Sequence, residues 1–194
     1  MTLRVISGEA RGRKLKSVPG DTTRPITDRA KESLFDILAG DVVDSTWWDL
    51  FGGTGAVGIE ALSRGASFVR FSDRERLAVE TIKENLEHCR FTSRAEVRRG
   101  DAFGLLAGTP DRAFDYVYIA PPQYKDMWKQ ALHRLDENPG WLGEDCEVIA
   151  QIDPREYESV ELEYLVEFER RKYGSTLLVF YERKDIDAGR SGTV

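Results

Sequence analysis

The chain has 194 residues, 41% of them hydrophobic, and a formal net charge of −6 at pH 7; this length suits one domain whose core buries about 70% of the unfolded surface. No apolar run approaches the ~18 residues of a membrane span, and residues 1–4 do not begin a signal peptide, so we expect a cytoplasmic protein. Two cysteines and two histidines argue against a disulfide framework and leave almost no ligands for a metal.

Positive charge gathers at the beginning of the chain. Residues 1–31 contain eight Lys and Arg against three Asp and Glu, a net charge of +5, which leaves −11 for the rest. In Gly8–Lys14 glycines are interleaved with cations, a pattern that can follow a phosphate backbone closely. Because Lys and Arg displace counterions from phosphates, residues 1–45 are predicted to form a basic extension that contacts a polyanion. The alternative is a solvated pair of terminal strands.

The first predicted elements are a small hairpin and a helix. Residues 3–7 and 14–18 can pair as two strands, and Thr27 is a suitable N-cap for a helix that runs to about Leu38. Strands and helices then alternate. The predicted strands cover residues 46–51, 67–72, 95–99, 114–119 and 146–152, and the predicted helices cover 56–64, 76–88, 102–107 and 126–135. This alternation is typical of a doubly wound α/β fold with a parallel sheet.

The end of the chain departs from this alternation. Residues 160–168 and 175–181 are two β-rich runs joined by a short turn through Tyr173 and Gly174, with no helix between them. We expect an antiparallel hairpin that completes a mostly parallel, Rossmann-like sheet of seven strands. Residues 46–184 would form this α/β domain, and the polar tail 185–194 is expected to be disordered.

A glycine-rich loop follows the strand at residues 46–51. Residues 49–58 read Asp-Leu-Phe-Gly-Gly-Thr-Gly-Ala-Val-Gly, and the glycines let the backbone approach a ligand closely. The spacing G-x-G-x-x-G from Gly53 matches the dinucleotide fingerprint, and Asp73 lies where a ribose-binding acid is expected. Asp49 favours S-adenosylmethionine (SAM) instead, because an acid at this strand end suits a cationic amino-acid tail rather than a pyrophosphate.

Two further acids follow the next strands. Asp73 can accept both hydroxyls of an adenosine ribose, and Asp101 can accept from the adenine amine. Each acid alone would be a common surface residue or helix cap, but the ends of three successive strands lie at one edge of a parallel sheet. The predicted cofactor-binding residues are Asp49, Phe51, Gly52, Gly53, Thr54, Gly55, Asp73, Asp101 and Ala102.

The loop after the strand at residues 114–119 is the candidate catalytic segment. Its two prolines make it rigid, and their carbonyl groups are free to accept from a substrate amine. Tyr124 offers a ring on which a flipped base can stack. The plainer interpretation is an ordinary Pro-Pro strand exit with a core tyrosine. The candidate catalytic residues are Ala120, Pro121, Pro122, Gln123 and Tyr124.

Taken together, these motifs resemble a known family. From Arg4 to about Lys184 the chain is similar to the bacterial 16S ribosomal RNA guanine-N2 methyltransferases of the RsmD type, within the class I SAM-dependent methyltransferases. The matching segments are Arg4–Gly8, Arg11–Leu15, Arg24–Arg29, Glu32–Phe35, Asp49–Gly55 and Glu60–Ala66. One departure is that the family loop usually reads Asp- or Asn-Pro-Pro-aromatic, whereas Ala120 replaces the polar residue and Gln123 precedes Tyr124 here.

The resemblance implies a reaction and its partners. It implies transfer of the SAM methyl group to the exocyclic N2 of a guanine in 16S rRNA, either naked or in an assembling small subunit. Apart from the resemblance, we expect a monomer that needs no metal. The RNA-binding residues implied are Arg4, Arg11, Arg13, Lys14, Arg24 and Arg29. Three alternatives stay open: a methyltransferase of this fold acting on another amine in DNA or protein, a catalytically inactive RNA-binding module, and a NAD-dependent oxidoreductase. The last has no Tyr-x-x-x-Lys or His–Asp arrangement to support it.

Overall fold

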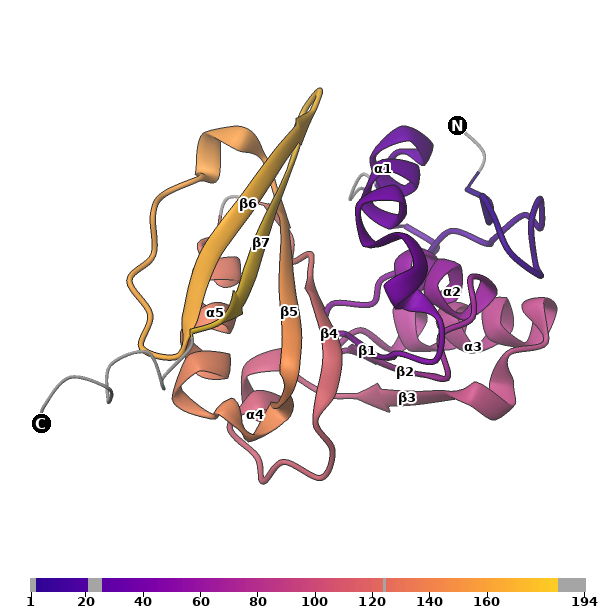
Figure 1. The fold of residues 1–194 in the computed structure, drawn as a ribbon. Coiled ribbons are helices and arrows are strands. Elements are labelled where there is room, and N and C mark those ends of the chain that lie inside the picture. The colour runs from indigo at the N-terminus through magenta and orange to yellow at the C-terminus, as the bar shows by residue number, and fades with distance from the viewer. Residues whose placement is uncertain (1–2, 21–25, 124, 185–194) are drawn as a thin grey trace, which may run out of the picture.

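A mixed sheet organises the molecule. The computed structural model describes residues 3–20, 26–123 and 125–184, and within these ranges a seven-stranded sheet has the order β3-β2-β1-β4-β5-β7-β6 (Figure 1). The strands are β1 (Thr46–Asp49), β2 (Phe68–Asp73), β3 (Ala95–Arg99), β4 (Phe114–Ile119), β5 (Leu142–Ile152), β6 (Leu165–Tyr173) and β7 (Thr176–Arg183). Strands β1 to β5 pair parallel with one another, and β7 pairs antiparallel with both β5 and β6. The predicted fold class is therefore confirmed.

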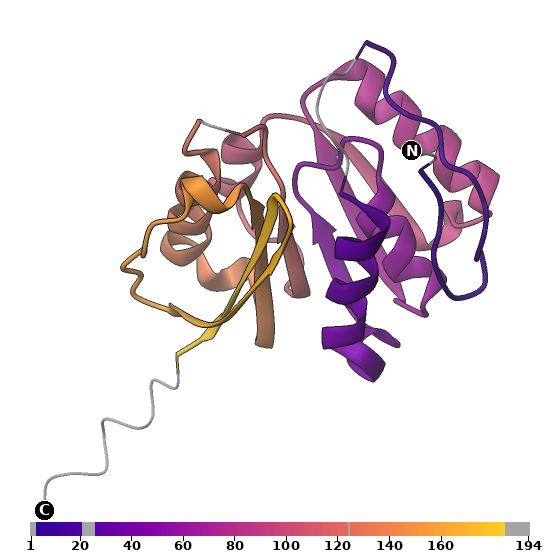
Figure 2. The same ribbon diagram turned by 90° about the horizontal axis from the view of Figure 1, so that it is seen from above.

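Helices cover both faces of the sheet (Figures 1 and 2). One face carries α1 (Asp28–Leu38), α2 (Ala56–Ser63) and α3 (Arg76–Cys89), and the other carries α4 (Ala102–Leu106) and α5 (Met127–Glu137). Short 3-10 turns lie at η1 (Ala39–Val42), η2 (Thr92–Arg94), η3 (Pro139–Trp141) and η4 (Pro154–Glu156). Thr27 caps α1 as predicted, since its side chain accepts the N–H of Ala30. None of the helices in the described ranges is both long and apolar enough to cross a membrane.

Two neighbouring tryptophans on β1 show how the core divides. Successive residues of a strand point to opposite faces, so Trp47 stacks on Phe35 of α1, with ring centroids 5.5 Å apart, while Trp48 packs against Trp141 at 4.8 Å. Both indoles are almost completely buried. The sheet thus has an apolar layer on each side, as expected for strands covered by helices on both faces.

The last strands differ from their predicted limits. β5 begins at Leu142 rather than Cys146, because an irregular register with β4 admits the residues after Leu142 into the strand. β6 begins at Leu165 rather than at residue 160 and continues to Tyr173. The delay has a physical cause: the carboxylate of Asp136, at the end of α5, accepts the N–H groups of residues 163–165 at 2.5 to 2.9 Å. These bonds hold the incoming chain on α5 before it joins the sheet.

The N-terminal arm, defined as residues 3–20, pairs antiparallel as predicted, but only around one bridge, Arg4 to Lys14. Three backbone hydrogen bonds join its two halves near that bridge. The amides of Ile6 and Ser7 donate instead to the carboxylate of Glu60 on α2, at 2.8 and 2.9 Å. Side chains of the helices thus take the backbone groups that a strand partner would have used. In Figure 2 the indigo arm runs along the outside of α2 and α3.

Glu60 is the centre of this attachment. Its side chain is fully buried and forms ion pairs with Lys31 of α1 at 3.4 Å and with Arg64 at 2.9 Å. The ammonium group of Lys31 also donates to the carbonyl of Arg4 at 2.6 Å. Burial lowers the pKa of Lys31, and the Glu60 carboxylate opposes that effect. One buried charge network therefore joins the arm, α1 and α2.

Candidate active site

A cavity of about 930 Å³ opens at the carboxyl edge of the parallel strands. The residues that line it come from the ends of β1, β2, β4 and β5, from the loop after β3, and from the arm. This is the edge at which open α/β sheets bind ligands. Every predicted cofactor-binding residue lines the cavity except Gly55, which lies behind the loop as the N-cap of α2.

Asp49 provides a buried negative charge at the end of β1. It is only 2% exposed, and its carboxylate accepts one long hydrogen bond, from the N–H of Gly58 at 3.3 Å. Burial raises the pKa of Asp49 to about 7, the Gly58 bond opposes that effect, and Asp73 adds to it. A carboxylate with so little compensation favours a cation beside it. The amino group of SAM is such a cation.

Asp73 lies at the end of β2, beside the glycine-rich loop. One carboxylate oxygen accepts the N–H of Gly53 at 2.9 Å and the other accepts the N–H of Glu75 at 2.9 Å. Each oxygen keeps a free lone pair, since a carboxylate offers about four acceptor positions. The side chain is thus fixed in orientation and can still accept from two hydroxyl groups of a ligand.

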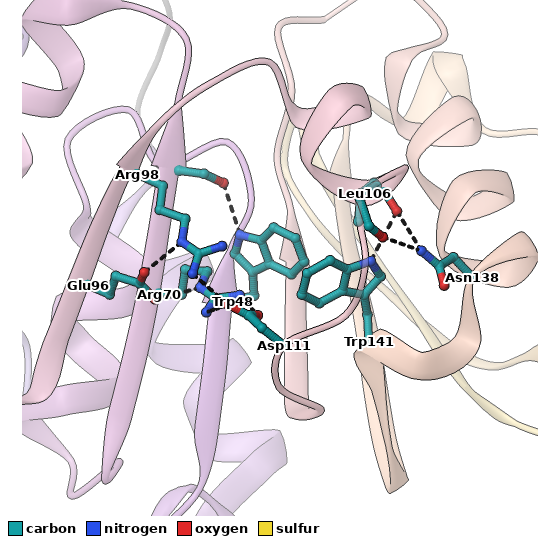
Figure 3. Close-up of polar contacts among 10 residues, drawn as sticks. Trp48, Arg70, Glu96, Arg98, Leu106, Asp111, Asn138 and Trp141 are labelled. Carbon is teal, nitrogen blue, oxygen red and sulfur yellow. Dashed lines mark hydrogen bonds and ion pairs between the residues drawn. The ribbon is translucent and has the colours of Figure 1, made fainter.

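Asp101 follows β3 and begins the wall formed by α4. Its carboxylate accepts the N–H of Gly104 at 3.0 Å and so caps the helix. The other end of α4 is anchored as well, because the carbonyl of Leu106 accepts from the indole of Trp141 at 3.0 Å and from the amide of Asn138 at 2.9 Å (Figure 3). The short helix is held at both ends. Asp101 and Ala102 therefore have fixed positions at the rim of the cavity.

A buried arginine secures the loop after α4. Arg70 of β2, whose side chain is 3% exposed, forms a two-pronged ion pair with Asp111 and a third contact with Glu96, and Arg98 pairs with the same two acids (Figure 3). Hydrogen bonds from Arg70 and then Arg98 lower the pKa of Asp111 to about 2. The guanidinium of Arg70 also lies 5.0 Å from the ring centre of Phe114. This network fixes the loop that joins α4 to β4.

The substrate side of the cavity contains most of the candidate catalytic loop. Ala120, Pro121, Pro122 and Gln123 line the cavity, whereas Tyr124 lies outside the described residues. The cavity is also lined by residues that were not predicted, among them Ile26, just before α1, and Tyr118 and Gln151 on β4 and β5. The sequence pattern could have indicated Gln151, because it is the one polar residue among the apolar residues 148–152 at the end of its strand.

None of the predicted RNA-binding residues that the structure describes lines the cavity. Two of them have partners within the protein, since Arg4 pairs with Asp28 at 3.0 Å and Arg13 donates to the carbonyl of His88. Arg24 lies outside the described residues. The remaining three are exposed and have no ion-pair partner in the part of the chain that the structure describes: Arg11, Lys14 and Arg29. The unpaired positive charge is therefore smaller than the composition of the arm indicated.

Known proteins share both this sequence and this fold. The chain is 39% identical over 185 residues to YlbH of Bacillus subtilis (strain 168), which covers 94% of the chain and 100% of that relative. It is 35% identical over 146 residues to "Ribosomal RNA small subunit methyltransferase D" of Escherichia coli (strain K12), with 74% of the chain and 71% of the relative covered. The solved structure of yhhF from Escherichia coli superposes with a TM-score of 0.82 at 30% identity, over 95% and 99% of the two chains.

A family match covers nearly the whole chain. The family described as "Conserved hypothetical protein 95" matches residues 3–182, which includes the arm, the cavity and the final hairpin. The predicted methyltransferase class is confirmed, and solved methyltransferase structures at 13% and 15% identity share the fold. The chain therefore belongs to the family described as "Conserved hypothetical protein 95", that of the RsmD-type methyltransferases its motifs resemble.

Proposed function

We propose that this protein transfers a methyl group from SAM to the exocyclic N2 of a guanine in the RNA of the small ribosomal subunit. One observation carries the proposal: a buried carboxylate with a single long hydrogen bond and a rigid Pro-Pro loop line the same cavity. Asp49 on β1 is in register with Tyr118 on β4, and the loop begins two residues later at Ala120. A cationic cofactor tail and a substrate amine would thus meet between neighbouring strands.

The cofactor half of the cavity matches the chemical groups of SAM. Asp49 would pair with the amino group, Asp73 would accept from the ribose hydroxyls, and Asp101 would accept from the adenine amine. When bound, SAM would supply a methyl group on a sulfonium, and the neutral thioether formed when that C–S bond breaks is an excellent leaving group. The protein therefore needs no nucleophilic side chain, and its task is to position the two reactants and to exclude water.

The substrate half has to hold an amine with its lone pair directed at the methyl group. The carbonyl of Pro121 and the side chain of Gln123 are proposed acceptors for the amine hydrogens. Tyr124 is proposed to stack on the base. Ala120 offers no side-chain acceptor, and the loss of one such hydrogen bond costs about 1–3 kcal/mol where nothing replaces it.

The setting of the reaction follows from the relatives and from the charge of the chain. The Escherichia coli relative is named for methylation of small-subunit rRNA, which supports 16S rRNA or an assembling subunit as the substrate. We propose that residues 1–45 contact this RNA through their exposed cations and that residues 46–184 carry the reaction. We also propose a cytoplasmic monomer with no metal requirement; gel filtration and an assay in EDTA test the last two points.

The test is transfer of labelled methyl from SAM to small subunits isolated from cells that lack this protein, followed by nucleoside analysis. N2-methylguanosine at one position is the expected product. A label in another nucleoside would overturn the guanine-N2 assignment. Transfer to DNA or protein alone would move the reaction to another amine, and SAM binding without any transfer would identify an inactive binding module. Calorimetry with SAM separates that last case from a protein that has no cofactor site.

A further inference from the structure

A polar side chain lies beside the alanine that begins the catalytic loop. β4 and β5 are parallel, and Ile119 pairs with Ala150, so the residues that follow, Ala120 and Gln151, are neighbours at the carboxyl edge. Both line the cavity. The residue before Gln151 and the residue after it are buried apolar side chains. Gln151 is therefore the position at which β5 presents a polar group to the substrate half.

The carboxamide of Gln151 is held in one orientation. The hydroxyl of Tyr118 donates to Oε1 of Gln151, and Tyr118 is 2% exposed. Burial, together with the nearby Asp49, raises the pKa of Tyr118 well above its ordinary value, so the hydroxyl keeps its proton and remains a donor. Nε2 of Gln151 has no hydrogen-bond partner among the residues that the structure describes. One lone pair of Oε1 and the Nε2 donors remain for a ligand.

These free groups complement one edge of guanine. Along that edge the exocyclic N2 amine is a donor and the adjacent ring nitrogen N3 is an acceptor. A carboxamide presents an acceptor and a donor side by side, so it can bind both atoms at once. An acceptor on one amine hydrogen also fixes the plane of the amine and hence the direction of its lone pair. Adenine has no amine at this position and would leave Oε1 without a partner.

We propose that Gln151 recognises the amine-bearing edge of the substrate guanine and supplies from β5 the polar contact that Ala120 does not provide. This role rests on the proposed methyl transfer to guanine. Gln123 also lines the cavity, but it is exposed on the loop. Gln151 is partly buried on a strand flanked by β4 and β7, with its amide held by a buried hydroxyl. Such support is what a contact with a reacting amine requires.

The test compares three variants in the small-subunit assay. Gln151→Leu keeps the size of the side chain but removes both hydrogen-bonding groups, so kcat should fall about 10- to 100-fold. The Kd for SAM and the melting temperature should stay close to those of the unaltered protein. Gln130→Leu, at an exposed position on α5, is the matched control and should retain full activity. Ala120→Asn, added to Gln151→Leu, should recover most of the lost kcat because it returns an acceptor to the neighbouring strand.

Each result decides a separate point. Unchanged kcat in Gln151→Leu overturns the role of Gln151, as does a loss of SAM affinity that accounts for the whole effect. The double variant can also bind SAM and still show no recovery of kcat. That result overturns the proposal that a polar group at residue 151 takes the place of one at residue 120. If the unaltered protein transfers no methyl group to RNA, the proposed function itself fails, and this role of Gln151 fails with it.

Discussion

Replacement of Asp49 by Asn should stabilise the folded protein while removing SAM binding. Asp49 is 2% exposed and its pKa is about 7, against an ordinary value of 3.8. Each pH unit between those values corresponds to about 1.4 kcal/mol, so ionisation of Asp49 in the cofactor-free fold costs about 4 kcal/mol. Asn is nearly isosteric, carries no charge and can still accept the N–H of Gly58.

The sign of the pH dependence follows from the direction of the shift. Because the pKa of Asp49 is raised in the folded state, its contribution to stability is fully present below about pH 4. That contribution is lost as the pH rises through about 7. Asn does not ionise, so Asp49→Asn does not lose stability in this way. Its unfolding free energy should therefore exceed that of the unaltered protein by an amount that grows between pH 4 and 7 and reaches about 4 kcal/mol above pH 7.

Urea unfolding of both proteins between pH 5 and 8 measures the effect, and calorimetry at pH 8 measures SAM affinity. Asp145→Asn, at an exposed acid on β5, is the control and should change neither quantity. SAM binding by the unaltered protein should also weaken below pH 7, where Asp49 takes up a proton in the free state. An Asp49→Asn protein that is no more stable at pH 8, or that binds SAM normally, would refute the reasoning.

Three further variants test the arm and the cavity wall. Glu60→Gln leaves the buried ammonium of Lys31 without its counter-charge and should cost about 3–5 kcal/mol in urea unfolding; Lys31→Met in the same chain should recover part of this. Gly8→Ala should lower the melting temperature and expose the arm to trypsin, because the new Cβ would lie 1.7 Å from a carbonyl oxygen of α2 at φ +80°. Arg70→Met should cost about 1–3 kcal/mol and weaken SAM binding, since the loop that joins α4 to β4 loses its ion pair with β2.

Controls for these variants are available in the same chain. Gly12→Ala places a residue at a similar backbone angle, φ +83°, but its Cβ would meet nothing within 4 Å. It should cost only the ~1–2 kcal/mol of the left-handed conformation. Equal losses of stability in Gly8→Ala and Gly12→Ala would contradict the predicted clash. An unchanged unfolding free energy in Glu60→Gln would contradict the role of the buried ion pair. Unchanged SAM affinity in Arg70→Met would show that the Arg70–Asp111 ion pair does not support the cofactor site.

The sequence determined the fold class and the general position of the cavity. Alternation of apolar strands with helical stretches is a local pattern, so the strands, the order of the acids Asp49, Asp73 and Asp101, and the final hairpin could all be predicted from it. The residue roles proposed for the cavity stay predictions. The structure does bring the acids of β1 and β2, the capping acid of α4 and the Pro-Pro loop to the same edge, as a parallel sheet requires.

Only the tertiary structure decided how distant side chains replace regular backbone pairing. Backbone amides of the arm donate to Glu60, and amides of the chain before β6 donate to Asp136, in both cases between residues far apart in sequence. These bonds limit the pairing within the arm to one bridge and delay the start of β6 to Leu165. Likewise, Tyr118 and Gln151 meet because β4 and β5 are in register over the cavity, which no local pattern reports. Local propensity specifies elements, but contacts between distant residues depend on the packing of the whole sheet.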